Sequence, residues 1–201
     1  MKLNYSATSP YVRKVMVLAK ETNLDGMIDC IETDVWDEQS GLRQRNPLGK
    51  VPALETDDGM VLFDSAVICA YLDTLHGGQR FIPVAEQVHW QVLRIQAVSD
   101  GIMDAAFQSV METSKREADA RSDFWLDRYN LAMNSGIDWL ADHFDEFAES
   151  LNFAPICVAV ALGYVDFRHA ELGWRERHGE MADWIDKFNQ RESMKSTNPA
   201  A

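Results

Sequence analysis

The chain has 201 residues, of which 46% are hydrophobic and 25% are charged, without a low-complexity tract. These proportions are typical of a globular protein with one large or two small domains. The 32 acidic and 19 basic residues give a formal net charge of −13. Because such a surface repels nucleic acid and anionic lipid, the composition argues against both as partners.

The sequence predicts neither secretion nor a membrane span. Its N-terminus does not resemble a signal peptide, and its longest apolar run, residues 156–165, is shorter than the roughly 20 residues that cross a bilayer. The cysteines at positions 30, 69 and 157 are far apart and odd in number, which is typical of reduced thiols. We expect a cytoplasmic protein.

The first third of the chain alternates strand and helix signals. Short apolar runs bounded by turn residues predict strands at residues 3–5, 27–33, 51–55 and 60–63. Apolar residues at helical spacing predict helices at residues 10–21 and 66–75, with a short helix in the polar stretch 36–45. The resulting order, βαβαββα, is that of a complete small α/β domain.

Strand signals stop after the Gly77-Gly78 pair, which marks a linker at about residues 77–85. The remaining chain predicts an all-helical bundle. Its expected helices cover residues 86–116, 120–148, 152–168 and 178–190. The predicted domains are therefore residues 1–78 and 86–201.

Ser9 and Pro10 suit the N-cap and first position of the first helix. A helix N-terminus carries partial positive charge and unpaired N–H groups, so it can hold an anion. Asp64 and Ser65 open the next predicted helix in the same manner. Each pair can also serve only as a cap.

Pro52 stands at the start of a predicted strand, where proline cannot donate to the ladder. If the Val51–Pro52 bond is cis, the backbone N–H and C=O of Val51 turn outward and can pair with the backbone of a ligand. The alternative is a trans proline in an edge strand.

Several segments, in this order and spacing, resemble the glutathione transferase family, in particular its bacterial theta-like and beta-like members. Three of them are similar to the glutathione-binding segments of that family, one to its helical-domain signature and one to its C-terminal segment. They cover residues 9–15, 46–54, 64–68, 163–168 and 191–199. The resemblance implies a thioredoxin-like domain followed by an all-α domain, with reduced glutathione as co-substrate.

The resemblance also implies which residue activates the glutathione thiol. Ser9 matches the serine of theta-like members and would donate a hydrogen bond to the thiolate. Ser6 is the main competitor, because beta-like members place their cysteine near that point. Since the chain has no Cys-x-x-Cys motif, disulfide exchange through an enzyme cysteine is disfavoured.

By the same resemblance, the glutathione backbone would pair with Val51, which precedes Pro52. Ser65 would bind the γ-glutamyl carboxylate and Asp64 would face the ammonium group. Lys50 is placed to reach the glycyl carboxylate.

An electrophile pocket is expected between the domains, lined by Tyr11, Met103, Phe107 and Met111. The last three are at helical spacing on one helix, which is also how core residues are spaced. The identity of the electrophile cannot be read from these residues.

The expected activity is a glutathione transferase that attacks a small hydrophobic electrophile, in the service of detoxification. The alternatives are a non-catalytic module that binds the transcription or translation machinery, and a glutathione-dependent thiol reductase. No metal is expected, because the five histidines lack paired metal-ligand spacing. The resemblance further implies a homodimer, in which the first domain of one subunit packs on the helical domain of the other.

In the helical domain, relatives usually open the central helix with a Ser/Thr-x-x-Asp capping box. Here that stretch runs from Asn152 to Pro155. We expect Asn152 to cap the helix and Pro155 to be tolerated in its first turn, but without the reciprocal carboxylate.

Overall fold

A computed structural model describes residues 1–84, 86–150 and 152–199. The chain divides into two compact units. Unit 1 comprises Met1–Ile82 together with the segment that begins at Glu192, and unit 2 comprises Pro83–Arg191. Each unit is described by itself.

Unit 1 is built on a four-stranded sheet of order β2-β1-β3-β4. Its strands are β1 (Lys2–Tyr5), β2 (Asp29–Glu32), β3 (Ala53–Glu55) and β4 (Val61–Leu62). Strand β1 pairs in parallel with β2, whereas the β1–β3 and β3–β4 pairs are antiparallel. The parallel pair requires a crossover, which is supplied by a helix.

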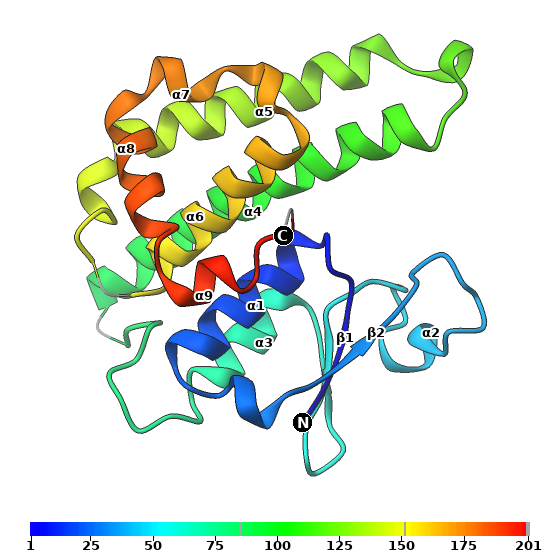
Figure 1. Ribbon diagram of the computed structural model, residues 1–201, viewed down its shortest axis with the longest axis vertical. Helices are drawn as coiled ribbons and strands as arrows, with labels where there is room; N and C mark the ends of the chain where they lie inside the picture. Colours follow the sequence, from blue (N-terminus) through cyan, green and yellow to red (C-terminus); the bar gives the residue numbers. More distant parts are fainter. Residues whose placement is uncertain (85, 151, 200–201) are drawn as a thin grey trace. The chain divides into compact units, whose positions relative to one another are not determined.

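The helices of unit 1 are α1 (Pro10–Glu21), α2 (Leu42–Arg45) and α3 (Ser65–Leu72), with a 3₁₀ turn at Asp25–Met27. Figure 1 shows α1 and α3 together on one side of the sheet and α2 on the other. On the side of the sheet that α1 and α3 cover, the side chains of Leu3, Leu54, Val15, Leu18 and Ile68 have no exposed surface. The predicted order βαβαββα is therefore confirmed.

The C-terminal helix α9 (Glu192–Lys195) packs on α1. Arg13 of α1 donates from Nη2 to the carbonyl of Met194, over 3.3 Å, and the Ser193 hydroxyl donates to the Glu21 carboxylate. Burial lowers the pKa of Arg13 to about 10. From the sequence we expected residues 86–201 to form the helical domain, whereas these contacts group the segment that begins at Glu192 with unit 1. The sequence did not indicate this, because a four-residue helix is too short for its apolar spacing to show which unit it packs on.

Asp73, at the C-terminal end of α3, holds the chain that leaves unit 1. Its side chain is fully buried and accepts hydrogen bonds from the backbone N–H of Phe81 at 2.7 Å and of Ile82 at 3.0 Å. His76 Nε2 lies 3.0 Å from the same carboxylate. Because a buried carboxylate needs such partners, the segment after Gly77-Gly78 is fixed on unit 1 as far as Ile82.

Unit 2 contains helices but no strand among its described residues. Its helices are α4 (Glu86–Ser114), α5 (Asp123–Asp142), α6 (Phe153–Arg168), α7 (Trp174–Arg177) and α8 (Gly179–Phe188), with 3₁₀ turns at Ala118–Ala120, Phe144–Glu146 and Ala170–Leu172. Helices α4 and α5 form a long antiparallel hairpin (Figure 1). Helix α6 also packs on α4, and its first ten residues are all buried.

The ends of α6 are fixed by polar side chains. Asn152 Oδ1 accepts a hydrogen bond from the N–H of Ala154 at 3.0 Å, so the expected cap is confirmed. Near the other end, Asp166 accepts hydrogen bonds from the Trp174 indole and from Arg175 Nη2, both at 2.7 Å. Asp166 raises the pKa of Arg175 and joins α6 to α7.

Among the described helices, none is alone long and apolar enough to span a bilayer. Only α6 taken together with residues 170–177, across a bend of 99°, meets the criteria of length and composition.

Two helical glycines provide a matched test of packing between α4 and α5. A Cβ at Gly136 would lie 2.7 Å from Ile102 Cγ1, whereas one at Gly101 would meet no atom within 4 Å. Alanine is better than glycine in a helix by about 1 kcal/mol, and overpacking costs about 1–3 kcal/mol. We predict that Gly101→Ala raises the free energy of unfolding in urea by about 1 kcal/mol, and that Gly136→Ala lies about 1–3 kcal/mol below it. Equal stabilisation by both would contradict the close approach at Gly136.

Candidate functional site

Ser9 is the N-cap of α1. Its Oγ accepts a hydrogen bond from the N–H of Val12 at 3.3 Å, and its own N–H donates to the carbonyl of Ser6 at 3.1 Å. A hydroxyl that accepts one hydrogen bond still has its hydrogen to donate. Ser9 is only partly buried, so it can present that hydrogen at the positive end of the helix dipole.

Ser6 precedes Ser9 by three residues and lies between the end of β1 and the exposed residues Ala7 and Thr8. Its carbonyl accepts the hydrogen bond from the N–H of Ser9, and its side chain is half-buried. Unlike Ser9, it precedes the helix rather than capping it. The geometry therefore gives Ser9 the more favourable electrostatic position for an anion.

The Val51–Pro52 peptide bond is cis. Pro52 is buried and directly precedes β3, which is an inner strand of the sheet rather than the edge strand of the alternative interpretation. No hydrogen bond joins the backbone N–H or C=O of Val51 to another of the residues that the structure describes. These groups remain able to pair with a ligand.

Asp64 and Ser65 begin α3. Asp64 is the exposed N-cap, and its Oδ1 accepts a hydrogen bond from the N–H of Ala66 at 3.0 Å. The Phe63–Asp64 bond before it is also cis. Ser65 is the first helical residue and has only 2% of its surface exposed.

Strand pairing places these three segments at the same end of the sheet. Asn4 of β1 lies opposite Ala53 of β3, so the chain leaves β1 toward Ser9 where Val51 and Pro52 enter β3. Leu62 of β4 lies opposite Leu54, and continuing this antiparallel register brings Asp64 opposite Pro52. The N-termini of α1 and α3 and the unpaired backbone of Val51 therefore lie at the same end of the sheet.

The turn from α2 to Val51 is held by Asn46. Its Oδ1 accepts a hydrogen bond from the N–H of Leu48 at 3.0 Å, and its Nδ2 donates to the carbonyl of Lys50 at 2.8 Å. The Lys50 side chain is exposed. Arg43 also lies against this turn, at Gly49. The sequence analysis did not predict a role for Arg43, although the absence of acidic residues between positions 39 and 54 indicates that this stretch is basic.

The expected electrophile residues lie on two elements. Tyr11 is in the first turn of α1 and is half-buried, whereas Met103, Phe107 and Met111 are all on α4. Met103 has no exposed surface, while Phe107 and Met111 are half-buried. Met103 therefore belongs to the packed interior, and a pocket with these four residues stays a prediction.

Other features of the described residues do not compete with this site. No group of three or more His, Cys, Asp or Glu side chains is arranged there to hold a metal ion. An open hollow of about 380 Å³ is lined by Lys2, Asp29, Glu55 and Asp57 among others, at the far end of the sheet from Ser9. Burial and the neighbouring Asp29 raise the pKa of the Cys30 thiol, which does not favour its use as a nucleophile.

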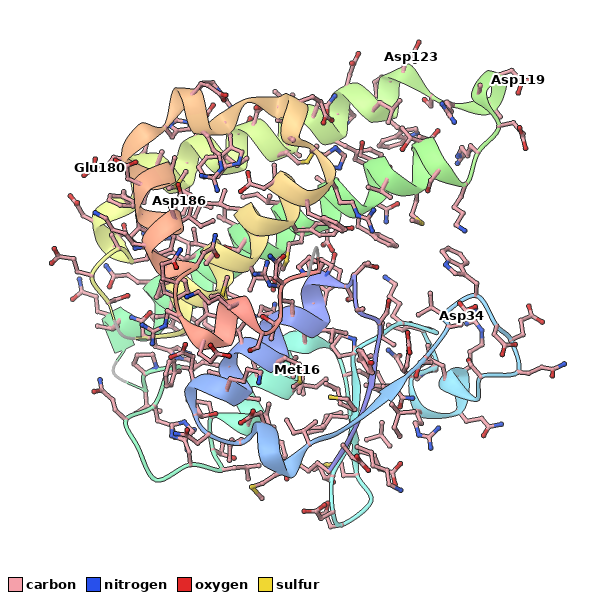
Figure 2. The ribbon with its side chains drawn as sticks, in the orientation of Figure 1. Met16, Asp34, Asp119, Asp123, Glu180 and Asp186 are labelled. Atoms are coloured by element: carbon pink, nitrogen blue, oxygen red, sulfur yellow. The ribbon has the colours of Figure 1, made fainter. Side chains whose placement is uncertain are left out.

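Charge is unevenly divided between the units. Unit 2 carries 19 acidic and 10 basic residues, against 13 and 9 in unit 1. Figure 2 shows exposed acidic side chains on unit 2, namely Asp119, Asp123, Glu180 and Asp186. In unit 1, the stretch that leads to Val51 contains Arg43, Arg45 and Lys50. The candidate site therefore has a basic border.

Comparison with known proteins gives one consistent result. The family model for the glutathione S-transferase N-terminal domain matches residues 8–75. The uncharacterized GST-like protein YibF of Escherichia coli (strain K12) is 33% identical over 202 residues, covering 99% of this chain and 98% of YibF.

Two solved structures of similar length agree with that match. One is a glutathione transferase family member from Pseudomonas fluorescens Pf-5 with bound glutathione, 40% identical, with a TM-score of 0.94 and 98% of each chain covered. The other is a glutathione S-transferase from Methylobacillus flagellatus KT, also with glutathione bound, 33% identical, with a TM-score of 0.92 and 98% of each chain covered. With the sheet, the cis proline and the two capped helices already described, these matches show that the chain belongs to the glutathione transferase family.

Proposed function

We propose that this protein binds reduced glutathione and activates its thiol for attack on a small hydrophobic electrophile. The observation that carries the proposal is the convergence of Ser9, Val51 and Ser65 at one end of the sheet. The bound glutathione in the two solved relatives supports the choice of ligand. Three free cysteines suit a reducing compartment such as the cytoplasm, where such a reaction would serve detoxification.

In this mechanism Ser9 donates its hydroxyl hydrogen to the thiolate of glutathione, and the N-terminus of α1 adds favourable potential. A free thiol has a pKa of about 8.5. Lowering that pKa by about two units requires roughly 2.7 kcal/mol of preference for the thiolate. One charge-assisted hydrogen bond and a helix dipole together supply energies of this size.

The remaining contacts would hold the tripeptide in place. The unpaired backbone of Val51 would bond the cysteinyl unit, as a strand neighbour would. The N-terminus of α3 at Ser65 would receive the γ-glutamyl carboxylate, and the exposed Asp64 carboxylate would face the ammonium group. Lys50 would attract the glycyl carboxylate.

The two alternative functions have weaker support. A thiol reductase would need an activated cysteine at the helix N-terminus, but that position is Ser9, and Cys69 and Cys157 are buried. A non-catalytic interaction module has no need for an unpaired Val51 backbone beside two helix N-termini. Failure to bind glutathione would nevertheless favour the interaction module.

We predict that reduced glutathione binds the wild type in calorimetric titration and forms thiolate, detected by its ultraviolet absorbance. Ser9→Ala should abolish most of the thiolate signal, because the hydrogen-bond donor is lost. Ser6→Ala should retain it. No heat from the wild type at millimolar glutathione would contradict the proposed function, and loss of thiolate in Ser6→Ala instead would reassign the donor.

Ser9→Ala also removes an N-cap, which typically costs about 1 kcal/mol of stability. Ser122→Ala is the matched control, since Ser122 caps α5 by accepting a hydrogen bond from the N–H of Trp125 at 3.4 Å. Both variants should lose similar stability in urea, but only Ser9→Ala should lose the thiolate.

The pH dependence follows from the same hydrogen bond. A lowered thiol pKa keeps the reactive thiolate present above that pKa and loses it as pH falls through it. We predict that the rate with an activated aryl halide rises with pH to a plateau below the pKa of free glutathione. In Ser9→Ala the rise should move up toward about 8.5. Identical profiles would show that Ser9 does not set the thiol pKa.

We further propose that the protein is a homodimer, with unit 1 of one subunit on unit 2 of the other. Phe124 and Leu131 of α5 are 64% and 63% exposed, and Leu48 in unit 1 is 65% exposed. Large apolar side chains that gather on one exposed helix commonly mark a binding surface. A second copy of the chain would cover them.

We predict a native mass of twice the chain mass of 22.8 kDa in sedimentation or light scattering. The double substitution Phe124→Ser with Leu131→Ser should weaken the dimer, because it replaces apolar contact area with polar groups. A wild type found at 22.8 kDa across micromolar concentrations would refute the dimer.

A further inference from the structure

Strand β2 forms one edge of the sheet and is exposed along its whole length. The sheet order leaves β2 with one neighbour, β1, among the described strands, and all four residues of β2, Asp29–Glu32, are exposed. The opposite edge differs, because β4 has only two residues and both are half-buried. Short or covered edges resist pairing with other chains, whereas a longer exposed edge can accept another strand.

The hydrogen-bonding groups on the outer side of β2 are unused. In a parallel ladder, alternate residues of a strand bond the same neighbour. The N–H groups of Asp29 and Thr33 each donate to a carbonyl within residues 1–5 at 2.9 Å, so the odd-numbered residues of β2 face β1. The N–H and C=O groups of Cys30 and Glu32 therefore point outward, and none of them bonds another backbone group within the described ranges. They can pair with an extended backbone from outside.

The same edge is strongly acidic. Residues 25–38 contain six acidic and no basic residues. Asp25 is paired with a lysine 3.2 Å away, but Asp29 and Glu32 form no ion pair within the part of the chain that the structure describes. Asp34, labelled in Figure 2, continues the negative charge beyond the end of β2. Because like charges repel across paired strands, this edge disfavours a second copy of the chain and favours a basic segment.

The surroundings of β2 leave room for the side chains of an added strand. The open hollow of about 380 Å³ begins at residues 26–29, where the chain enters β2. Its lining includes the carboxylates of Glu55 and Asp57 as well as Lys2. Beside it, Met27 is 53% exposed, and Ile31 on β2 is 37% exposed. A strand that lies along β2 would thus meet apolar side chains and a space for one long side chain.

We propose that β2 docks an extended, basic segment of another protein, which adds to the sheet of unit 1 as a further strand. The backbone of the segment would bond the outward groups of Cys30 and Glu32. Its lysine or arginine side chains would pair with Asp29 and Glu32. Backbone pairing gives such complexes their affinity, and the charges select the partner. The docking edge uses no residue of the proposed glutathione site, so it does not depend on the proposed function.

The test adds short capped peptides to the full chain. The first peptide alternates lysine with threonine, the second has glutamate in place of lysine, and the third is the lysine peptide with every backbone nitrogen methylated. Binding is followed by nuclear magnetic resonance and by hydrogen exchange of single amides. The lysine peptide should bind and slow exchange at Cys30 and Glu32. The methylated peptide keeps the charge but cannot pair as a strand, so it should not slow exchange, and the glutamate peptide should not bind.

Charge variants test the choice of a basic partner. Asp29→Asn combined with Glu32→Gln should weaken binding of the lysine peptide about fivefold at low salt, because two exposed ion pairs are lost. The matched control, Asp119→Asn with Glu180→Gln, removes the same charge from exposed positions of unit 2. Its affinity for the lysine peptide should equal that of the wild type. Thermal melting of each variant establishes that it is folded.

Three results would overturn the proposal. If the lysine peptide does not bind at millimolar concentration, β2 is not a docking edge. If the peptide binds without slowing exchange at Cys30 and Glu32, or the methylated peptide binds equally well, the attraction is electrostatic only and no strand is added. If both double variants weaken binding equally, the net charge of the protein rather than β2 sets the affinity.

Discussion

The antiparallel pairing of β1 with β3 is the constraint on which the candidate site depends. It places the exit of β1 beside the entry of β3, and the β3–β4 register adds the start of α3 at the same end. Ser9, Val51 and Ser65 are far apart in the sequence, and each alone is an ordinary cap or loop residue. They lie at one site because of the hydrogen-bonded pairing of the strands, and not because their side chains contact one another.

Local sequence signals were sufficient where one residue type has one strong preference. Ser9 followed by Pro10 fixed the start of α1, and the helix ends at Glu21 as expected. Asn152 caps α6 for the same reason. The strand expected at residues 51–55 begins only at Ala53, because Pro52 follows a cis bond and has no N–H for the ladder.

Long-range contacts account for most of what the sequence did not reveal. The expected helix 120–148 ends at Asp142, and its remainder contains a 3₁₀ turn at Phe144–Glu146, since apolar spacing alone does not distinguish the two kinds of turn. Arg43 belongs to no sequence motif, and its contact with the turn before Val51 is possible only because Gly49 has no Cβ. Met103 has the same helical spacing as Phe107 and Met111, yet only Met103 is completely buried. Periodicity identifies the side of a helix but not its depth in the fold.

The return of α9 to α1 has a consequence for how such a protein can be divided. Met194 is almost fully buried and its carbonyl accepts the hydrogen bond from the buried Arg13, so the last helix completes the surface of unit 1 from the other end of the chain. A fragment cut after Ile82 would leave Arg13 without this acceptor and expose the apolar surface around Met194's position. Any exchange of N-terminal domains between relatives, whether by evolution or in the laboratory, must therefore transfer the tail together with the first 82 residues or adapt α1 to a new one.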